Sequence, residues 1–286
     1  MLTNISLLYA GSPSEQGALI FSAALADALG VSVDCRYAAD VLSLLSADQR
    51  AEYRALIEVD GLERAQDYLA RVYESQRSSH VEAAQAAYRL SASSSHLIWG
   101  EPLDLRGDAR QVLATLGYMH DMIVAGFDLP PAVLEPAIEQ VLIAAGAPLA
   151  LIARPPTAAS VEQMAMVYAW KPSAPAKRAL RYALPLFRKA RQVYLVAIED
   201  DSEPPLTPSV QDIADYLMNV HSVSTSPLVV QAADSPQRQL ADLYAEVGAD
   251  LLVMGAYSHS RLQRLFFGDF TSHFLKKRPC NLLLAH

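Results

Sequence analysis

The chain has 286 residues, of which 52% are hydrophobic and 19% are charged, and its formal net charge is −8. This length suits two domains of ordinary size, and the composition excludes a largely disordered chain. The acidic balance argues against nonspecific nucleic-acid binding, and the sequence has no apolar run long enough to span a membrane. Two isolated cysteines, Cys35 and Cys280, favour a reducing compartment, and the N-terminus lacks a signal-peptide pattern. We therefore expect a cytoplasmic protein.

The first half predicts short strands separated by helices. Apolar segments at residues 5–10, 122–126 and 149–153 are typical of buried strands, and the first of them ends at a turn containing Gly11 and Ser12. Residues 47–90 are rich in Ala, Glu, Arg and Gln and predict an additional helical hairpin on the surface. This hairpin carries no recognisable chemistry and is a candidate lid or interaction surface.

The second half alternates strands and helices more regularly. The predicted strands are residues 165–170, 193–198, 228–232, 251–255 and 281–285, and the predicted helices are 174–190, 210–220, 237–247 and 272–277. Such alternation requires parallel pairing with right-handed crossovers. The fold class is therefore α/β, with a doubly wound parallel sheet whose ligands lie at the carboxyl ends of strands, where the winding reverses.

The two halves are copies of one domain. The segment from His120 to Gly126 aligns with the segment from Ala249 to Gly255, and one internal repeat of domain length indicates duplication. Two prolines in residues 154–157 favour a linker, so we predict domains at 1–153 and 158–286. Residues 1–153 carry a net charge of −10 and residues 154–286 carry +2. Only the second copy therefore has a net charge that suits a polyanionic ligand. Neutral variation of charged residues on the solvent-exposed surface explains the difference equally well.

The terminal strands at residues 149–153 and 281–285 should each lie at a sheet edge. Exposed edges invite pairing, so joining the two copies would cover both within one chain as an internal pseudo-dimer. Homodimerisation of the whole chain is left open by this argument.

A candidate anion loop follows the strand at residues 251–255. The strand ends at Gly255 and is followed by Ser258, His259 and Ser260, and a second glycine stands at Gly268. Glycines allow the backbone to approach a ligand, and a loop that opens a helix presents N–H groups to a phosphate. Ordinary turn geometry and helix N-capping explain the same residues without a ligand.

The spacing Gly255-x-x-Ser258, nine residues and Gly268 resembles the nucleotide-binding signature of the universal stress protein family. The resemblance is clear over the second copy and fainter over the first, and it implies tandem domains that bind an adenine nucleotide such as ATP. Carried over position by position, it implies the following nucleotide-binding residues: Gly255, Ser258, His259, Ser260, Gly268, Asp269 and Thr271.

Several positions depart from the family pattern. Ser258 replaces the second glycine, and Asp269 stands where the family has Ser or Thr beside the phosphates. The family's adenine-contacting aspartate has no match, because the aligned segment begins with Trp170. Asp269 would either repel phosphate or help to hold Mg²⁺. In the first copy, prolines after Gly126 remove the N–H donors that a phosphate would need.

These observations favour a regulatory protein rather than an enzyme. The sequence contains no Walker motif, no dinucleotide-binding glycine motif, no nucleophile elbow and no pair of histidines with metal-ligand spacing. We expect an adenine-nucleotide site, if there is one, in the second copy only. The alternatives are a nucleotide-free interaction protein of the same fold and, as a weaker candidate, a slow ATP hydrolase.

Overall fold

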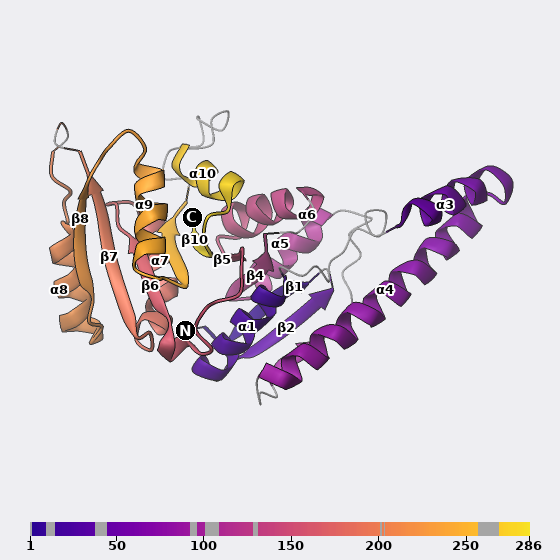
Figure 1. Cartoon of the computed structure of the whole chain (residues 1–286), viewed down its shortest axis with the longest axis horizontal. Coiled ribbons are helices and arrows are strands. Elements are labelled where there is room, and N and C mark those ends of the chain that lie inside the picture. Colours follow the sequence, from indigo (N-terminus) through magenta and orange to yellow (C-terminus); the bar gives the residue numbers. More distant parts are fainter. Residues whose placement is uncertain are drawn as a thin grey trace.

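A computed structural model describes residues 2–9, 15–37, 45–91, 96–100, 109–127, 131–200, 202, 204–256 and 269–286. In this part of the chain ten strands form one sheet, in the order β3-β2-β1-β4-β5-β10-β9-β6-β7-β8 (Figure 1). The first-repeat strands are β1 (Asn4–Tyr9), β2 (Ser32–Tyr37), β3 (Leu97–Trp99), β4 (Met122–Gly126) and β5 (Leu149–Ile152). The second-repeat strands are β6 (Ala165–Ala169), β7 (Gln192–Glu199), β8 (Ser226–Gln231), β9 (Leu251–Gly255) and β10 (Leu282–Ala285).

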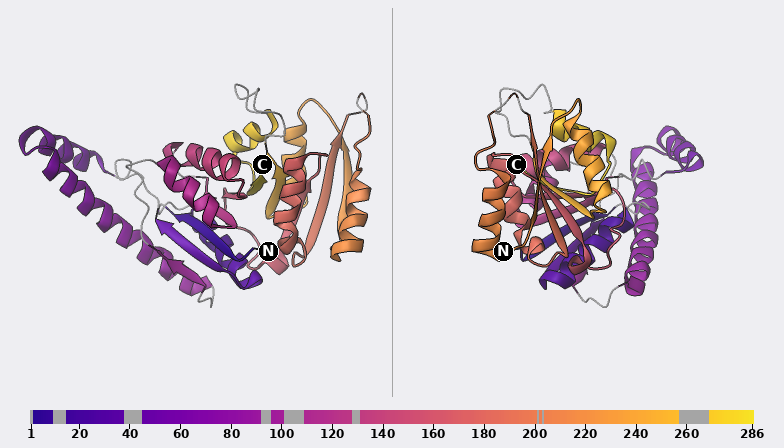
Figure 2. Two further views of the ribbon diagram at one scale, coloured as in Figure 1. Left: turned by 180° about the vertical axis from the view of Figure 1, so that it is seen from behind. Right: turned by 60° about the vertical axis from the view of Figure 1, so that its left-hand side comes forward.

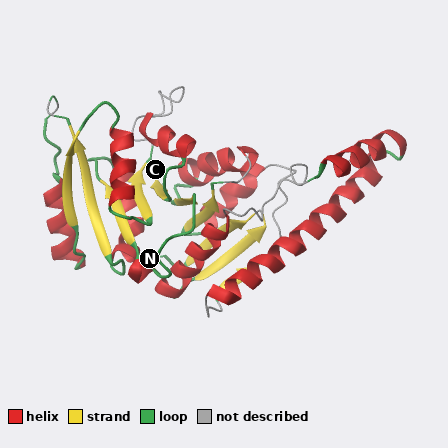
Figure 3. Ribbon diagram, in the orientation of Figure 1, coloured by secondary structure: helices red, strands yellow, loops and turns green. Residues whose placement is uncertain are grey.

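Helices connect the strands and cover both faces of the sheet (Figure 2, Figure 3). The first repeat contains α1 (Glu15–Leu29), α3 (Ala47–Val59), α4 (Leu62–Ser91), α5 (Ala109–Met119), α6 (Pro131–Pro136) and the π-helical η1 (Ala137–Ala144). The second contains a 3-10 turn, η2 (Val161–Gln163), and α7 (Ala174–Phe187), α8 (Val210–His221), α9 (Pro236–Glu246) and α10 (Asp269–Lys277). Because side chains alternate across a strand, two apolar cores form. One packs under α1, α7 and α8, and the other packs under α5, η1, α9 and α10.

The strand pairing confirms the predicted fold class and the internal pseudo-dimer. Every pairing within a repeat is parallel, as strand–helix alternation requires. The two repeats meet where β10 pairs antiparallel with β5, with Leu283 opposite Ala150. The predicted edge strands therefore cover each other, and both cores run across the junction.

An aspartate at the foot of each fourth repeat strand shows the duplication in atomic detail. Asp121 accepts hydrogen bonds from the Thr3 backbone N–H at 2.7 Å and from the Thr3 hydroxyl at 2.7 Å. Asp250 accepts the same pair from Thr157, at 2.8 and 2.6 Å, and a further bond from the Ala165 N–H. In both repeats, therefore, the carboxylate at the start of the fourth strand is hydrogen-bonded to the segment that precedes the first strand.

The predicted helical hairpin of residues 47–90 is present as α3 and α4. The hydroxyl of Ser46 caps α3, and Gly61 turns the chain with a positive φ of 86°. The hairpin projects from the body as an arm, held internally by a small apolar cluster that includes Leu45 and Leu69 (Figure 1).

Several element boundaries differ from the sequence prediction. The helix predicted at 174–190 ends at Phe187, and the strand predicted at 228–232 spans Ser226–Gln231. Residues 272–277, predicted to be part of a helix, lie in α10, which begins at Asp269. The strand difference has a tertiary cause, because β8 pairs with β7 from Ser226 onward. Among the described helices, none has both the length and the apolar character to cross a membrane.

Candidate functional site at the carboxyl ends of β6 and β9

The second repeat reverses its winding between β6 and β9. From β6 the chain crosses through α7 to β7, whereas from β9 it crosses through α10 to β10 on the other side. The two strands are direct neighbours, with Ala169 opposite Met254. Gly255 therefore ends β9 at the place where an open α/β sheet forms a crevice for ligands.

Gly255 lies directly against the first turn of α7. A Cβ atom at this position would be 2.4 Å from the Ala176 nitrogen and 2.7 Å from the Pro175 carbonyl carbon. Only glycine permits this approach, which brings the positive end of the α7 dipole to the carboxyl end of β9. The Ser173 hydroxyl accepts the Ala176 N–H at 3.2 Å and so caps the helix. Close packing of α7 thus accounts for this glycine.

Trp170 closes the carboxyl end of β6. Its side chain is only 7% exposed, and its indole N–H donates to the Pro208 carbonyl at 2.9 Å. Its ring packs near Tyr168, with a centroid separation of 6.2 Å. A buried indole therefore occupies the position that aligns with the family's adenine-contacting aspartate, and its hydrogen-bond donor is already used.

The remaining predicted site residues are placed only in part. Ser258, His259, Ser260 and Gly268 lie outside the described residues. Asp269 begins α10, and Thr271 is buried at 5% exposure in the first turn of that helix. No group of three His, Cys, Asp or Glu side chains that could hold a metal ion occurs among the residues that the structure describes.

The equivalent junction of the first repeat carries an acidic side chain that sequence reasoning missed. Gly126 ends β4 as Gly255 ends β9, but it faces the side chain of Glu15, the first residue of α1. Glu15 is fully buried, and a Cβ on Gly126 would be 2.6 Å from its Cγ. Burial and, to a smaller extent, the nearby Glu15 charge raise the pKa of Tyr9 to about 12. The available sequence signal was an acid in the first turn of the helix that follows β1.

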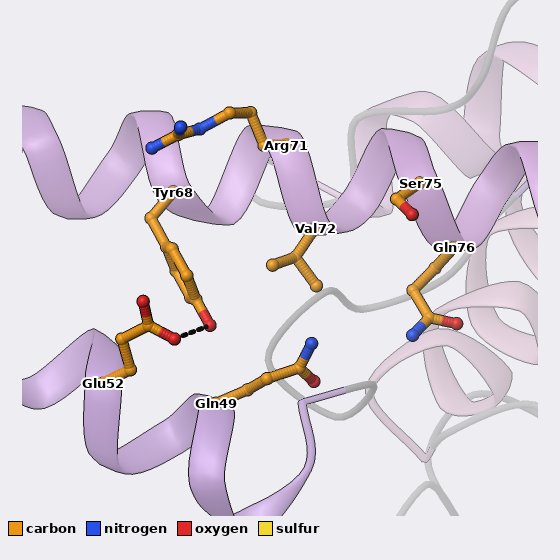
Figure 4. Close-up of a pocket in the computed structure, with 7 residues that line it drawn as sticks. All are labelled: Gln49, Glu52, Tyr68, Arg71, Val72, Ser75 and Gln76. Atoms are coloured by element: carbon orange, nitrogen blue, oxygen red, sulfur yellow. Dashed lines mark hydrogen bonds between the residues drawn. The ribbon is translucent and has the colours of Figure 1, made fainter.

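A depression of about 330 Å³ lies elsewhere, between the two helices of the arm (Figure 4). Its lining is mainly polar, and the Tyr68 hydroxyl donates to Glu52 at 2.8 Å across it. The lining residues are Gln49, Glu52, Tyr68, Arg71, Val72, Ser75 and Gln76. It is far from the β6–β9 junction and contains no grouping that indicates a reaction.

Comparisons with known proteins agree with this architecture. Residues 164–286 match the Universal stress protein family. A universal stress protein from Archaeoglobus fulgidus DSM 4304 superposes over 99% of this chain and 97% of its own, with a TM-score of 0.67 and 14% identity. A putative universal stress protein from Pseudomonas aeruginosa UCBPP-PA14 covers 99% of this chain and 93% of its own, with a TM-score of 0.58 and 10% identity. No curated protein matches the sequence.

Proposed function

Because this chain is a tandem member of the universal stress protein family, we propose that it is a stress-response regulatory module that binds an adenine nucleotide in its second repeat only. The observation that carries the restriction to one repeat is the difference in the groups that face the glycine at the two equivalent junctions. Gly126 faces a buried glutamate, whereas Gly255 faces the uncharged backbone of Pro175 and Ala176.

An ionised Glu15 would be enough to decide which repeat accepts a phosphate. A carboxylate about 5 Å from a phosphate, at an effective dielectric near 20, costs on the order of 3 kcal/mol per unit charge. That cost is more than a hundredfold in affinity, since about 1.4 kcal/mol corresponds to a factor of ten. An ionised Glu15 would therefore disfavour an anion in the first repeat.

Three features favour an anion in the second repeat. The α7 N-terminus is directed to the end of β9, and residues 154–286 carry a net charge of +2. The segment predicted to cradle the phosphates contains two hydroxyl residues, Ser258 and Ser260, the first of them three residues after Gly255. The family resemblance implies ATP as the ligand, and we propose that the β6–β9 junction binds its phosphates.

The test of one site per chain is titration calorimetry with ATP. We expect at most one ATP per chain, and we expect Gly268→Tyr to abolish binding. Gly126→Ala alters the first repeat, where Gly126 corresponds to Gly255, and should leave the affinity unchanged. Circular dichroism would confirm that both variants fold. Two equivalent sites per chain would contradict the proposal.

Asp269 provides a second test, which separates repulsion from metal binding. If its carboxylate repels the phosphates, Asp269→Ser should tighten ATP binding by about tenfold after screening, both with Mg²⁺ and with EDTA. If it helps to hold Mg²⁺, the same substitution should weaken binding only when Mg²⁺ is present. We propose repulsion, because the family has hydroxyls at this position. An affinity that does not change in either condition would show that the site is not used.

A nucleotide-free interaction protein is the second candidate function, and Trp170 favours it. Its buried indole fills the end of β6 on the side where the family resemblance implies the adenine. Mass spectrometry of any ligand released when the purified protein is denatured separates the two candidates. A released adenine nucleotide supports the first, and an empty protein that also fails to bind ATP supports the second. Phosphate release from ATP would show the third candidate, slow hydrolysis.

A further inference from the structure

One face of α7 carries a row of basic side chains. Lys177, Arg181 and Arg188 follow one another at intervals of four and seven residues, and all three are exposed. At the 3.6 residues per turn of a regular helix these positions lie within about 40° of one another, on the side away from the sheet; Pro185 lies within α7, and Arg188 is its C-cap residue. Within the described residues neither Lys177 nor Arg181 makes an ion pair, and Arg188 contacts only the ring of His221, at 3.3 Å. We call Lys177, Arg181 and Arg188 the basic row.

The charge around the basic row is not balanced locally. From residue 163 to residue 198 the sequence contains seven Lys or Arg residues and no Asp or Glu. A stretch of this length without an acid leaves the outer face of α7 positive, although the chain as a whole carries −8. The face therefore suits an acidic partner surface.

The arm carries a row of acidic side chains with the same spacing. Glu63, Asp67 and Glu74 of α4 are exposed and are also separated by four and seven residues. They lie opposite the side of α4 that packs on α3 through Ala65 and Leu69. Glu74 is paired with Arg77 at 2.7 Å, and two further arginines, Arg64 and Arg71, are exposed on the same helix, with Arg64 paired to Asp60 at 2.9 Å. We call Glu63, Asp67 and Glu74 the acidic row.

We propose that the acidic row of one chain docks along the basic row of a second copy of the same chain. Laid parallel, the two rows match at all three positions over about 16 Å, because each spans eleven residues of helix. The two helices lie in different repeats, and the arm extends away from the body (Figure 1, Figure 2). A two-fold axis would place each arm on the second repeat of its partner, so that each acidic row contacts the basic row of the other chain.

The arm tip supplies the apolar contact that such an interface needs. Val59 and Leu62 flank the hairpin turn and are 81% and 59% exposed, and Ile57 is 41% exposed. Leu62 directly precedes Glu63 in α4, so a partner surface that accepts the acidic row also reaches Leu62. Acidic groups at the tip disfavour an anionic membrane or a nucleic acid as its partner. The basic row of a second copy is thus the occupant that the charges of the acidic row favour.

Light scattering after size-exclusion chromatography tests the proposal on the intact chain. At about 0.05 M NaCl we expect twice the chain mass, and at about 0.5 M NaCl we expect the dissociation constant to rise at least about tenfold because the charges are screened. One variant changes the basic row to acids (K177E/R181E/R188E). A second variant changes the acidic row to bases (E63K/D67K/E74K). Each variant alone should have the mass of a single chain. The control K276E/K277E reverses two exposed charges on α10 and should leave the dimer unchanged.

Mixing the two variants provides the decisive measurement. In the mixed pair each acidic helix again faces a basic helix at both contacts, so we expect a one-to-one complex with nearly the affinity of the unmodified chain. A single-chain mass for the unmodified protein at low salt and high concentration would overturn the proposal. So would a dimer that neither variant weakens, or a mixture that fails to pair. Binding of a labelled DNA duplex that the basic-row variant abolishes, without any dimer, would assign the basic row to nucleic acid instead.

Discussion

Substitution of Gly255 by alanine measures how closely α7 is packed on the end of β9. The new Cβ would lie 2.4, 2.7 and 2.9 Å from three backbone atoms of Pro175 and Ala176. Ordinary carbon contacts are about 3.5 Å or longer, so the helix must move by roughly 1 Å. Overpacking typically costs about 1 to 3 kcal/mol, and the upper value applies here because backbone atoms cannot rotate away. We expect a loss of about 3 kcal/mol in the free energy of unfolding.

Gly126→Ala is the matched control, because Gly126 has the same place in the first repeat. Its new Cβ would meet the Glu15 Cγ at 2.6 Å, and the other contacts are 3.4 Å or longer. A side chain can adjust where backbone cannot, so we expect a loss of about 1 kcal/mol. The entropic effect of replacing glycine with alanine is similar in both variants and cancels in the comparison.

Thermal unfolding followed by circular dichroism provides the assay. A loss of about 1 kcal/mol lowers the midpoint by roughly 2 °C in a chain of this size, so Gly255→Ala should unfold about 6 °C below the unmodified protein and Gly126→Ala about 2 °C below it. Equal midpoints for the two variants, or a lower midpoint for Gly126→Ala, would refute the close packing of α7 on Gly255.

Three further predictions follow from other contacts. The isolated second repeat, residues 157–286, should self-associate in light scattering because removal of β5 exposes the edge of β10; a stable monomer would contradict the internal pseudo-dimer. Burial raises the pKa of Asp121, but the hydrogen bonds from Thr3 and Asn4 outweigh this effect and lower it overall. Asp121→Asn should therefore lower the urea midpoint at about pH 7, and the difference should vanish as the pH falls below the lowered pKa of the native carboxylate; a difference that persists in acid would count against this assignment. Trp170→Phe removes the donor to the Pro208 carbonyl and should cost about 1 kcal/mol or more in stability, whereas an unchanged thermal midpoint would show that the bond contributes nothing.

The repeating pattern of the chain predicted most of the fold. Apolar segments such as residues 251–255 are long enough for strands and too short for helices, and their alternation with helical segments leaves parallel pairing as the available arrangement. The aligned segments ending at Gly126 and Gly255 likewise predicted two copies of one domain, and edge exposure predicted their union through β5 and β10. These features depend on local patterning, which a single sequence displays directly.

The chemistry of the two junctions depended on residues that are distant in the sequence. A glycine at residue 255 is compatible with a ligand or with close packing, and only the position of α7, some eighty residues earlier, shows that backbone occupies the space a Cβ would fill. The same holds for Glu15 beside Gly126 and for Trp170 beneath Pro208, since burial arises only when the sheet brings the strand ends together. Periodicity and turn chemistry, which act between near neighbours, therefore determined the architecture. The charge and packing at the strand ends were decided by long-range contacts that only the tertiary structure contains.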